Sequence, residues 1–176
     1  MNWGEINRKH FSKSTDETES SPDTCLRLRV GLISVCDIAI GLANATFRLT
    51  EVTLGLIPAT ISPYVIAKIG VPHARRIMLN AHKLDGLSAA RLGLLNEVVS
   101  TVEELDAAVE REAAAALACA PGAIANSKKL IRYVSTHSHA DNLPYTATAL
   151  ADAWETAEVH EGIDAFFEKR KPKWAR

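Results

Sequence analysis

The chain has 176 residues, with 20 Lys and Arg against 21 Asp and Glu, and its formal net charge is −1. This balance excludes a strongly basic nucleic-acid-binding arm, and the length suits about one domain. The three cysteines, Cys25, Cys36 and Cys119, are far apart, which argues against a disulfide scaffold and against a zinc ribbon. We find neither an apolar run long enough to span a membrane nor a signal-peptide core at the start, so we expect a cytoplasmic protein.

Residues 1–29 differ in composition from the remainder of the chain. The stretch from Ser12 to Thr24 is rich in serine, threonine and acidic residues and has no apolar periodicity. Because such a segment buries too little apolar surface to offset its conformational entropy, we predict that this leader is disordered. Residues 30–176 are rich in Leu, Ile, Val and Ala, and we expect them to form the folded domain.

Short elements are predicted first in the folded part. We expect a short buried helix over Gly31–Cys36 and a buried strand over Asp37–Ile40, although periodicity cannot separate the two types in such short runs. A second extended segment follows at Phe47–Glu51, and glycine and proline mark a turn at Leu54–Pro58.

Helices then alternate with one more strand. Proline starts helices at Pro63–Ile69 and Pro72–Asn80, and a glycine separates them. Leu87–Gly93 is predicted as a short helix that Ser88 could cap, and Leu95–Val99 as a strand.

The last third of the chain is predicted to be helical. Thr101 and Glu104 have the spacing of a capping box and open an alanine-rich helix to Cys119, which Pro121–Gly122 stops. Three further helices are expected, over residues 123–135, 145–158 and 161–170.

Glu51 is the carboxylate with the most interesting surroundings. Its neighbours Leu49, Val52 and Leu54 are apolar. Apolar surroundings raise the pKa of a carboxylate toward the range of a general acid or base. From the local pattern alone, however, a solvated glutamate at the end of a strand is the commoner case.

Other candidates give weaker signals. We interpret Cys36 as a buried core thiol, because no basic group lies beside it. Asp37 suits a hydrogen-bond acceptor in a turn better than a catalyst. His137, His139 and Asp141 could suggest a metal site, but this spacing without further ligands is weak.

The tail from Phe166 onward combines aromatic and basic residues. It could be a solvated basic end, a nucleic-acid patch or a site for a phosphate-bearing cofactor, and the near-neutral chain argues against the second.

Several segments together resemble the enoyl-CoA hydratase/isomerase (crotonase) superfamily. They are Val30–Ile40, Phe47–Glu51, Leu54–Pro58, Leu87–Val99 and Glu161–Pro172, in the order and spacing of the family. The run from Pro58 to Val65 is most similar to bacterial methylglutaconyl-CoA hydratase-like members.

The resemblance implies an α/β fold, a partial crotonase-like β/β/α spiral with a mainly helical C-terminal trimerisation region. Members bind acyl-CoA thioesters and stabilise an enolate with two backbone N–H groups, at the place where charge develops. Coenzyme A is then part of the substrate, and no separate cofactor or metal is expected. The expected partners are acyl-CoA and other copies in a trimer or hexamer, or a full-length relative in a mixed oligomer, but neither nucleic acid nor a membrane.

The resemblance also implies roles for individual residues. Glu51 falls on the second of two catalytic glutamates that position and deliver water in hydratases, whereas Gly31 falls on the first. Pro58 and Ala59 fall on substrate-binding positions. Phe166 and Lys169 match positions that pack on the adenine and contact the phosphates of CoA, often from a neighbouring subunit.

Other positions depart from the family pattern. A glycine run that supplies an oxyanion N–H aligns with Arg27–Leu28–Arg29, where side chains would crowd the thioester. The leader lacks the alternation of a half-spiral that would hold the other donor. We therefore expect the C-terminal part of a crotonase that is impaired in catalysis when alone. The first alternative is a non-catalytic oligomerisation module that joins full-length trimers, and the second is an active hydrolase or isomerase with a rebuilt site.

Overall fold

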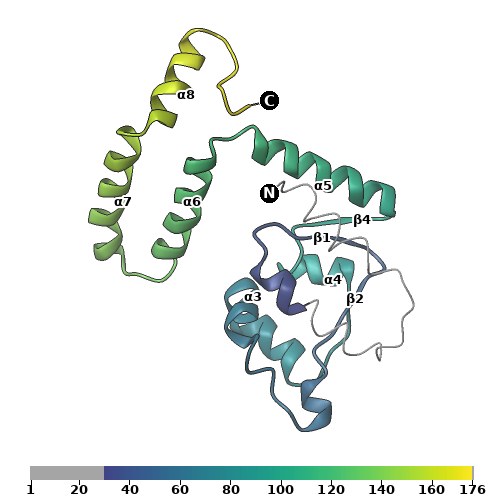
Figure 1. Ribbon diagram of the computed structural model, residues 1–176. Helices are drawn as coiled ribbons and strands as arrows, with labels where there is room; N and C mark the ends of the chain where they lie inside the picture. Colours follow the sequence, from purple (N-terminus) through teal and green to yellow (C-terminus); the bar gives the residue numbers. More distant parts are fainter. Residues whose placement is uncertain (1–29, 176) are drawn as a thin grey trace. The chain divides into compact units, whose positions relative to one another are not determined.

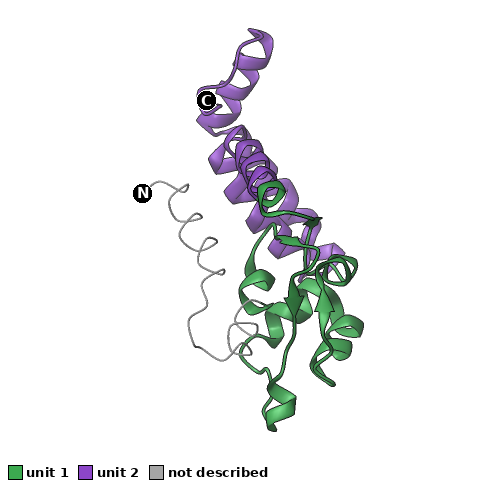
Figure 2. Cartoon of the chain, turned by 90° about the vertical axis from the view of Figure 1, so that its right-hand side faces the viewer, with its two compact units in different colours: residues 1–105 green, residues 106–176 purple. Residues whose placement is uncertain are grey.

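The computed structural model describes residues 30–175, which divide into two compact units at Leu105 and Asp106 (Figure 2). We describe each unit by itself. The prediction that residues 1–29 are disordered lies outside the described residues, as do Arg27–Leu28–Arg29. Within residues 30–175, no helix combines the length and apolar character that crossing a membrane requires.

The first unit contains a helical segment over residues 30–35 and two small sheets (Figure 1). In one sheet, β1 and β4 run parallel, with Ile40 opposite Glu97. In the other, β2 and β3 are antiparallel, with Phe47 opposite Leu84. The elements are β1 (Ile40–Leu42), β2 (Thr46–Phe47), the 3-10 helix η2 (Glu51–Leu54), α3 (Ser62–Met78), β3 (Leu84–Asp85), α4 (Gly86–Arg91), β4 (Glu97–Val99) and the start of α5 (Val102–Leu117).

One hydrophobic core holds the first unit together. Helix α3 contributes Val65 and Ile69, whose spacing of four residues places them on one face of its first half, and Ile77 from its second half. They pack with side chains from β2, β3, α4 and the segments that follow β2 and α4, namely Phe47, Leu49, Leu84, Ala89, Leu94 and Leu95. Full burial of each large side chain contributes roughly 1.5–3 kcal/mol of transfer free energy, so this cluster dominates the stability of the unit.

A glycine divides α3 as predicted. Gly70 has φ 74° and ψ 164°, a left-handed conformation that only glycine adopts readily, and Pro72 begins the second half. The prediction of two helices separated by this glycine is therefore confirmed.

Five expectations for the first unit are wrong. The helix over residues 30–35 is not buried, since Leu32 and Val35 are exposed, and Cys36 is exposed too rather than a core thiol. The strand begins at Ile40 rather than Asp37. Glu51 does not end a strand, because β2 stops at Phe47 and Glu51 opens η2. Helix α4 is capped by Asp85, which accepts a hydrogen bond of 2.7 Å from the backbone N–H of Ser88.

The second unit consists of helices. They are the remainder of α5, then α6 (Pro121–Val134), α7 (His139–Trp154) and α8 (Ala157–Phe167). Helices α6 and α7 lie side by side and antiparallel (Figure 1), and Tyr133 of α6 stacks on Tyr145 of α7 with ring centroids 3.6 Å apart. The predicted capping box at the start of α5 is confirmed, because the N–H of Glu104 donates to Thr101 Oγ1 at 3.2 Å and the N–H of Thr101 to Glu104 Oε2 at 3.3 Å.

Three predicted boundaries are wrong in the second unit. Helix α6 begins at Pro121 rather than at residue 123, since a proline at the first helical position lacks only an N–H that would be unpaired anyway. Helix α7 begins at His139 and not at Tyr145, because Ser138 and Asp141 form a capping box. Helix α8 begins at Ala157 rather than Glu161, and Thr156 caps it.

Candidate functional site

Glu51 is held at a fixed place by the buried segment before it. Leu49 and Thr50 are 1% and 2% exposed, and they anchor the chain immediately before η2. The carbonyl of Thr50 accepts hydrogen bonds from the N–H and the hydroxyl of Thr53, and Gly55, with φ 73°, ends the turn. A short rigid helix on a buried anchor therefore presents the Glu51 side chain.

Glu51 is half-buried, and one oxygen of its carboxylate is buried without a hydrogen-bond partner. Its Oε2 atom is shielded from solvent and has no hydrogen-bond partner among residues 30–175. A buried polar atom without a partner is costly, and such atoms concentrate where a ligand or a water completes the site. This arrangement suits a carboxylate that exchanges a proton with a water or a substrate.

Gly31, which the resemblance aligns with the other glutamate, lies against α3. A side chain at this position would start 2.9 Å from Ile61 Cγ2, so Ile61 closes the space that a larger residue would occupy. The residue before Gly31, Val30, lines the same apolar recess as Leu49. This recess has no interior space that could hold a water molecule, so it is part of the core and not a substrate pocket.

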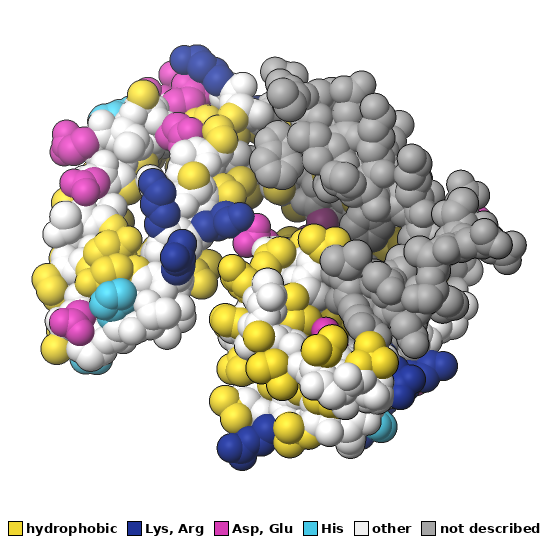
Figure 3. Space-filling view, turned by 60° about the horizontal axis from the view of Figure 1, so that its bottom comes forward, with side chains coloured by type: hydrophobic (Ala, Val, Ile, Leu, Met, Phe, Trp, Pro, Cys, Tyr) yellow, Lys and Arg dark blue, Asp and Glu magenta, His cyan; other side chains and the backbone are white. Residues whose placement is uncertain are grey.

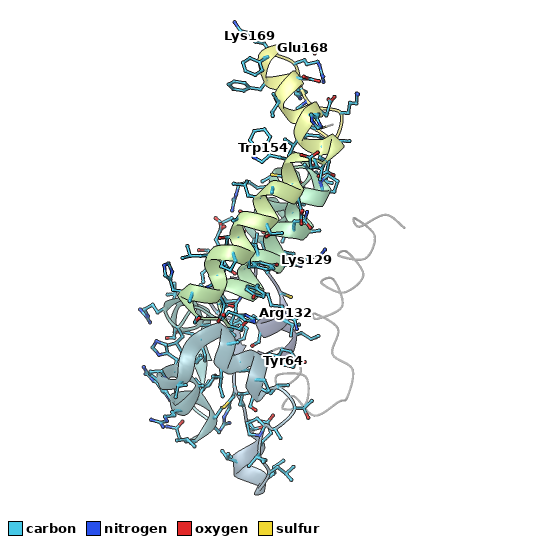
Figure 4. All side chains as sticks on the ribbon, turned by 90° about the vertical axis from the view of Figure 1, so that its left-hand side faces the viewer. Tyr64, Lys129, Arg132, Trp154, Glu168 and Lys169 are labelled. Atoms are coloured by element: carbon cyan, nitrogen blue, oxygen red, sulfur yellow. The ribbon has the colours of Figure 1, made fainter. Side chains whose placement is uncertain are left out.

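Pro58 and Ala59 form the tight turn between η2 and α3. The N–H of Ala59 donates to the Ile57 carbonyl at 2.8 Å, and the Pro58 carbonyl accepts from the N–H of Ser62 at 3.0 Å. Large apolar side chains around this turn are exposed: Leu54, Leu56, Ile57 and Tyr64. Figure 3 shows hydrophobic side chains gathered on the surface of this unit, and Figure 4 labels Tyr64 at the start of α3. The turn thus uses these backbone polar groups for its own hydrogen bonds and lies next to an apolar surface.

Phe166 and Lys169 belong to the second unit, at the end of α8. Phe166 is 79% exposed and meets Phe167 edge-on, with ring centroids 5.7 Å apart. Lys169 is the first residue beyond the helix cap and has φ 53°, the left-handed conformation (Figure 4). Among residues 30–175 its ammonium group has no ion-pair partner. An exposed aromatic ring and an unpaired cation therefore stand close together on the chain.

The tail after Lys169 folds back onto α8 through a cluster of charges. Arg170 holds the carboxylate of Glu161 with two hydrogen bonds, of 2.6 and 3.2 Å, and also binds Glu168. Lys173 contacts Glu161 twice. Its ammonium nitrogen lies 3.2 Å from Glu161 Oε2, and its backbone N–H donates a hydrogen bond of 2.9 Å to Glu161 Oε1. The side-chain hydrogen bond from Arg170 is the main reason why the pKa of Glu161 falls to about 2.

Another carboxylate joins two helices of the second unit. Glu158 of α8 accepts hydrogen bonds from the N–H groups of Gly122 and Ala123, at 2.9 and 3.0 Å, and so caps α6. Sequence reasoning missed this cap and the tail cluster, because their partners are too far apart to give a periodic pattern.

His137, His139 and Asp141, which the sequence offers as a weak metal site, do not form one in the structure. Within residues 30–175, no three His, Cys, Asp or Glu side chains come close enough to hold a metal ion.

Comparisons with known proteins identify the family. Residues 30–176 match the pattern of the family "Enoyl-CoA hydratase/isomerase". The chain is 32% identical over 147 residues to human enoyl-CoA hydratase domain-containing protein 2, covering 81% of this chain and 50% of the relative. It is 31% identical over 160 residues to mevalonyl-coenzyme A hydratase sidH of Aspergillus fumigatus, covering 85% and 56%. The chain thus spans about half the length of the curated relatives it matches.

Solved structures agree on the fold. An enoyl-CoA hydratase/isomerase from Marinobacter aquaeolei matches with a TM-score of 0.80 and 37% identity, over 84% of this chain and 56% of that one. Pseudomonas aeruginosa AtuE matches with a TM-score of 0.80 and 39% identity, over 84% and 57%. The expected fold class is therefore confirmed: the described residues form a mainly helical part of the α/β crotonase fold. By sequence and by fold, the chain belongs to the enoyl-CoA hydratase/isomerase family.

Proposed function

We propose that this chain binds the CoA part of an acyl-CoA thioester and supplies Glu51 as an acid–base carboxylate for the hydration of an enoyl-CoA. The observation that carries the proposal is the Oε2 atom of Glu51, which is buried and unpartnered among residues 30–175. A rigid turn on a buried anchor holds this atom, and the apolar surface around Pro58 and Ala59 suits an acyl chain.

The chemistry needs one group that can move a proton. Hydration forms a C–O bond at Cβ and a C–H bond at Cα, and the elements of one water are added across the double bond. Glu51 takes a proton from the attacking water and returns a proton to Cα, so the carboxylate ends the cycle ionised. Gly31 has no side chain to share this task, so of the two positions that align with catalytic glutamates only Glu51 can carry the proton.

The CoA moiety is held by the end of α8 in this proposal. The exposed ring of Phe166 offers a flat apolar face to the adenine, and the ammonium of Lys169 a point charge to the phosphates. We extend the proposal to a trimer or hexamer in which these residues serve the site of a neighbouring copy. We also propose that the chain prefers methylglutaconyl-CoA as its substrate and that it is located in the cytoplasm.

We also propose that the isolated chain is impaired in catalysis. The enolate needs preorganised N–H donors, and loss of one such donor costs on the order of 10²–10³-fold in rate. The aligned positions Arg27–Leu28–Arg29 carry side chains where the family pattern has glycines. Binding of thioester without appreciable turnover is the expected behaviour.

The test is an assay of the purified chain with crotonyl-CoA and 3-methylglutaconyl-CoA, beside Glu51→Gln. Glu104→Gln is the matched control, because Glu104 is a capping glutamate in the same unit. We expect binding of both thioesters with little or no turnover. Turnover that disappears in Glu51→Gln alone would overturn the impairment and support the role of Glu51. Turnover that survives in Glu51→Gln would overturn the role of Glu51.

The oligomerisation module is the second candidate, and one observation favours it. The second unit exposes large apolar side chains on every complete helix, namely Ile131, Leu143, Leu150, Trp154, Phe166 and Phe167. Such a surface is typical of an interface. The module predicts that the chain co-purifies with a full-length crotonase, that Leu150→Asp abolishes this, and that Asp152→Asn on the same helix does not. Absence of a mixed oligomer would exclude this candidate.

A further inference from the structure

We infer that Glu161 and Arg170, with Glu168 and Lys173, form a clamp that positions Lys169 for a phosphate-bearing ligand. This inference rests on the proposed function, because the ligand is the CoA that Phe166 and Lys169 are proposed to bind. These four residues are called the tail clamp below. None of them is proposed to touch the ligand, so they are positioning residues.

The backbone at Lys169 has an uncommon conformation at the turn that ends α8. Lysine rarely adopts a positive φ, and a residue held in this region persists only where its surroundings determine it. The N–H of Lys169 donates to the carbonyl of Phe166 and that of Arg170 to the carbonyl of Ala165, a pattern that reverses the chain after α8. The reversal brings Arg170 back over the helix, where it meets Glu161.

The geometry of the clamp is unusually specific for an ion pair near the surface. Both terminal nitrogens of Arg170 bind the two oxygens of Glu161, whose side chain is only 12% exposed. A bidentate guanidinium–carboxylate pair fixes orientation as well as distance. Beyond the pair, a side chain at Gly162 would start 3.3 Å from the ring of Trp174, so the tail packs closely on α8 there.

Charge within the clamp is balanced, so among residues 30–175 the ammonium of Lys169, like that of Lys171, stays outside its ion pairs. Two acidic groups, Glu161 and Glu168, face two basic groups, Arg170 and Lys173. Glu168 precedes Lys169 in the chain and could neutralise it, but its carboxylate is bound to Arg170 Nε. The clamp therefore performs two tasks: it fixes the backbone of Lys169 and it keeps a carboxylate away from the Lys169 ammonium.

A double-mutant cycle on CoA binding separates positioning from general stabilisation. The probe is coenzyme A, titrated into the full chain and into Glu161→Gln, Lys169→Gln and the double variant. Lys169→Gln removes the charge-assisted contact to phosphate and Glu161→Gln removes the positioning of Lys169, so we expect each single variant to weaken binding roughly tenfold. The double variant should bind about as weakly as either single variant, since Lys169 contributes only when it is positioned. Glu112→Gln, which breaks the exposed ion pair to Arg111 on α5, is the matched control and should bind as the unchanged chain does.

The outcomes are distinguishable. If CoA binds and the two factors multiply in the double variant, the clamp has no positioning role and this inference is overturned, while the proposed function stands. If the unchanged chain does not bind CoA, the proposed function and the role of the clamp both fail. If Lys169→Gln alone has no effect, the proposed CoA contact is wrong at this residue.

A second measurement needs no ligand. The N–H of Lys173 donates to Glu161, so its hydrogen exchange reports whether the clamp is closed. Glu161→Gln should raise the exchange rate at Lys173 and Arg170 and leave the helical amides of α6 unchanged. Equal rates at Lys173 in both proteins would overturn the clamp itself.

Discussion

The two units are stabilised by different kinds of interaction. Among residues 30–175, all but two of the buried apolar side chains lie in the first unit, and the exceptions, Ala108 and Ala165, are small. The second unit instead joins its helices through polar caps, ring stacking and the tail clamp. The first unit therefore has a core of its own to hold Glu51, whereas the second has apolar surface that remains to be covered.

The largest expected effect tests the core of the first unit. Leu94 is completely buried, so Leu94→Ala should lower the free energy of unfolding by about 3–5 kcal/mol through lost burial and the cavity left behind. Leu150→Ala in the second unit changes an exposed side chain and should alter the free energy of unfolding of the monomer by less than about 0.5 kcal/mol. Urea denaturation of both variants measures the contrast, and equal losses would contradict it.

Two glycines provide a sharper comparison. A Cβ at Gly86 would lie 2.1 Å from the carbonyl oxygen of Leu42, which is backbone and cannot move aside. Gly86→Ala should therefore cost about 2–3 kcal/mol of unfolding free energy. A Cβ at Gly122 would instead lie 2.6 Å from Glu158 Oε2, the end of a flexible side chain, so Gly122→Ala should cost about 1 kcal/mol. Thermal unfolding that ranks Gly122→Ala as the more harmful change would refute this explanation.

The cap between α6 and α8 should have a moderate effect. Glu158→Gln replaces a carboxylate by a neutral amide at the N-terminus of α6 and weakens two hydrogen bonds. We expect a loss of about 0.5–1 kcal/mol of unfolding free energy and faster amide exchange at Gly122 and Ala123. Glu155→Gln, an exposed residue near the end of α7, is the control. Unchanged exchange at both amides would show that the cap contributes nothing.

The smallest effect is on the pH dependence of the tail. The pKa of Glu161 is lowered to about 2, so the stabilisation by its ion pair is present above the ordinary pKa and is lost as the pH falls through about 2. The amide resonance of Lys173 should therefore keep its position from pH 7 to about 5 and shift only in stronger acid. A titration midpoint near the ordinary pKa of glutamate would show that Glu161 is not held by the ion pair of the clamp.

Local signals predicted local structure well. Thr101 and Glu104 are three residues apart, and the capping box that they form needs no other part of the fold. Gly70 and Pro72 likewise marked the division of α3. Ser138 and Asp141 carry the same kind of signal, but in the sequence Asp141 is considered only with His137 and His139, as a weak metal site, and the start of α7 is not predicted.

Distant partners could not be predicted. The sequence predicts Glu51 at the end of a strand, but β2 ends at Phe47, the buried residues Leu49 and Thr50 follow it, and Glu51 opens η2. Glu158 meets Gly122, which is 36 residues away, and no periodicity connects the two. The positions of Glu51, Pro58, Ala59, Phe166 and Lys169 came from the family resemblance, whereas the clamp that supports Lys169 came only from the structure.

The most direct test of the central claim follows the Glu51 carboxylate itself. The chain is labelled with ¹³C at glutamate side-chain carboxyl groups, the Glu51 resonance is assigned as the one missing in Glu51→Gln, and crotonyl-CoA is titrated. If Glu51 is the acid–base group at the acyl site, its resonance shifts as the ligand saturates, and that of the capping residue Glu104 does not. A Glu51 resonance that stays in place at saturating crotonyl-CoA would contradict the proposal.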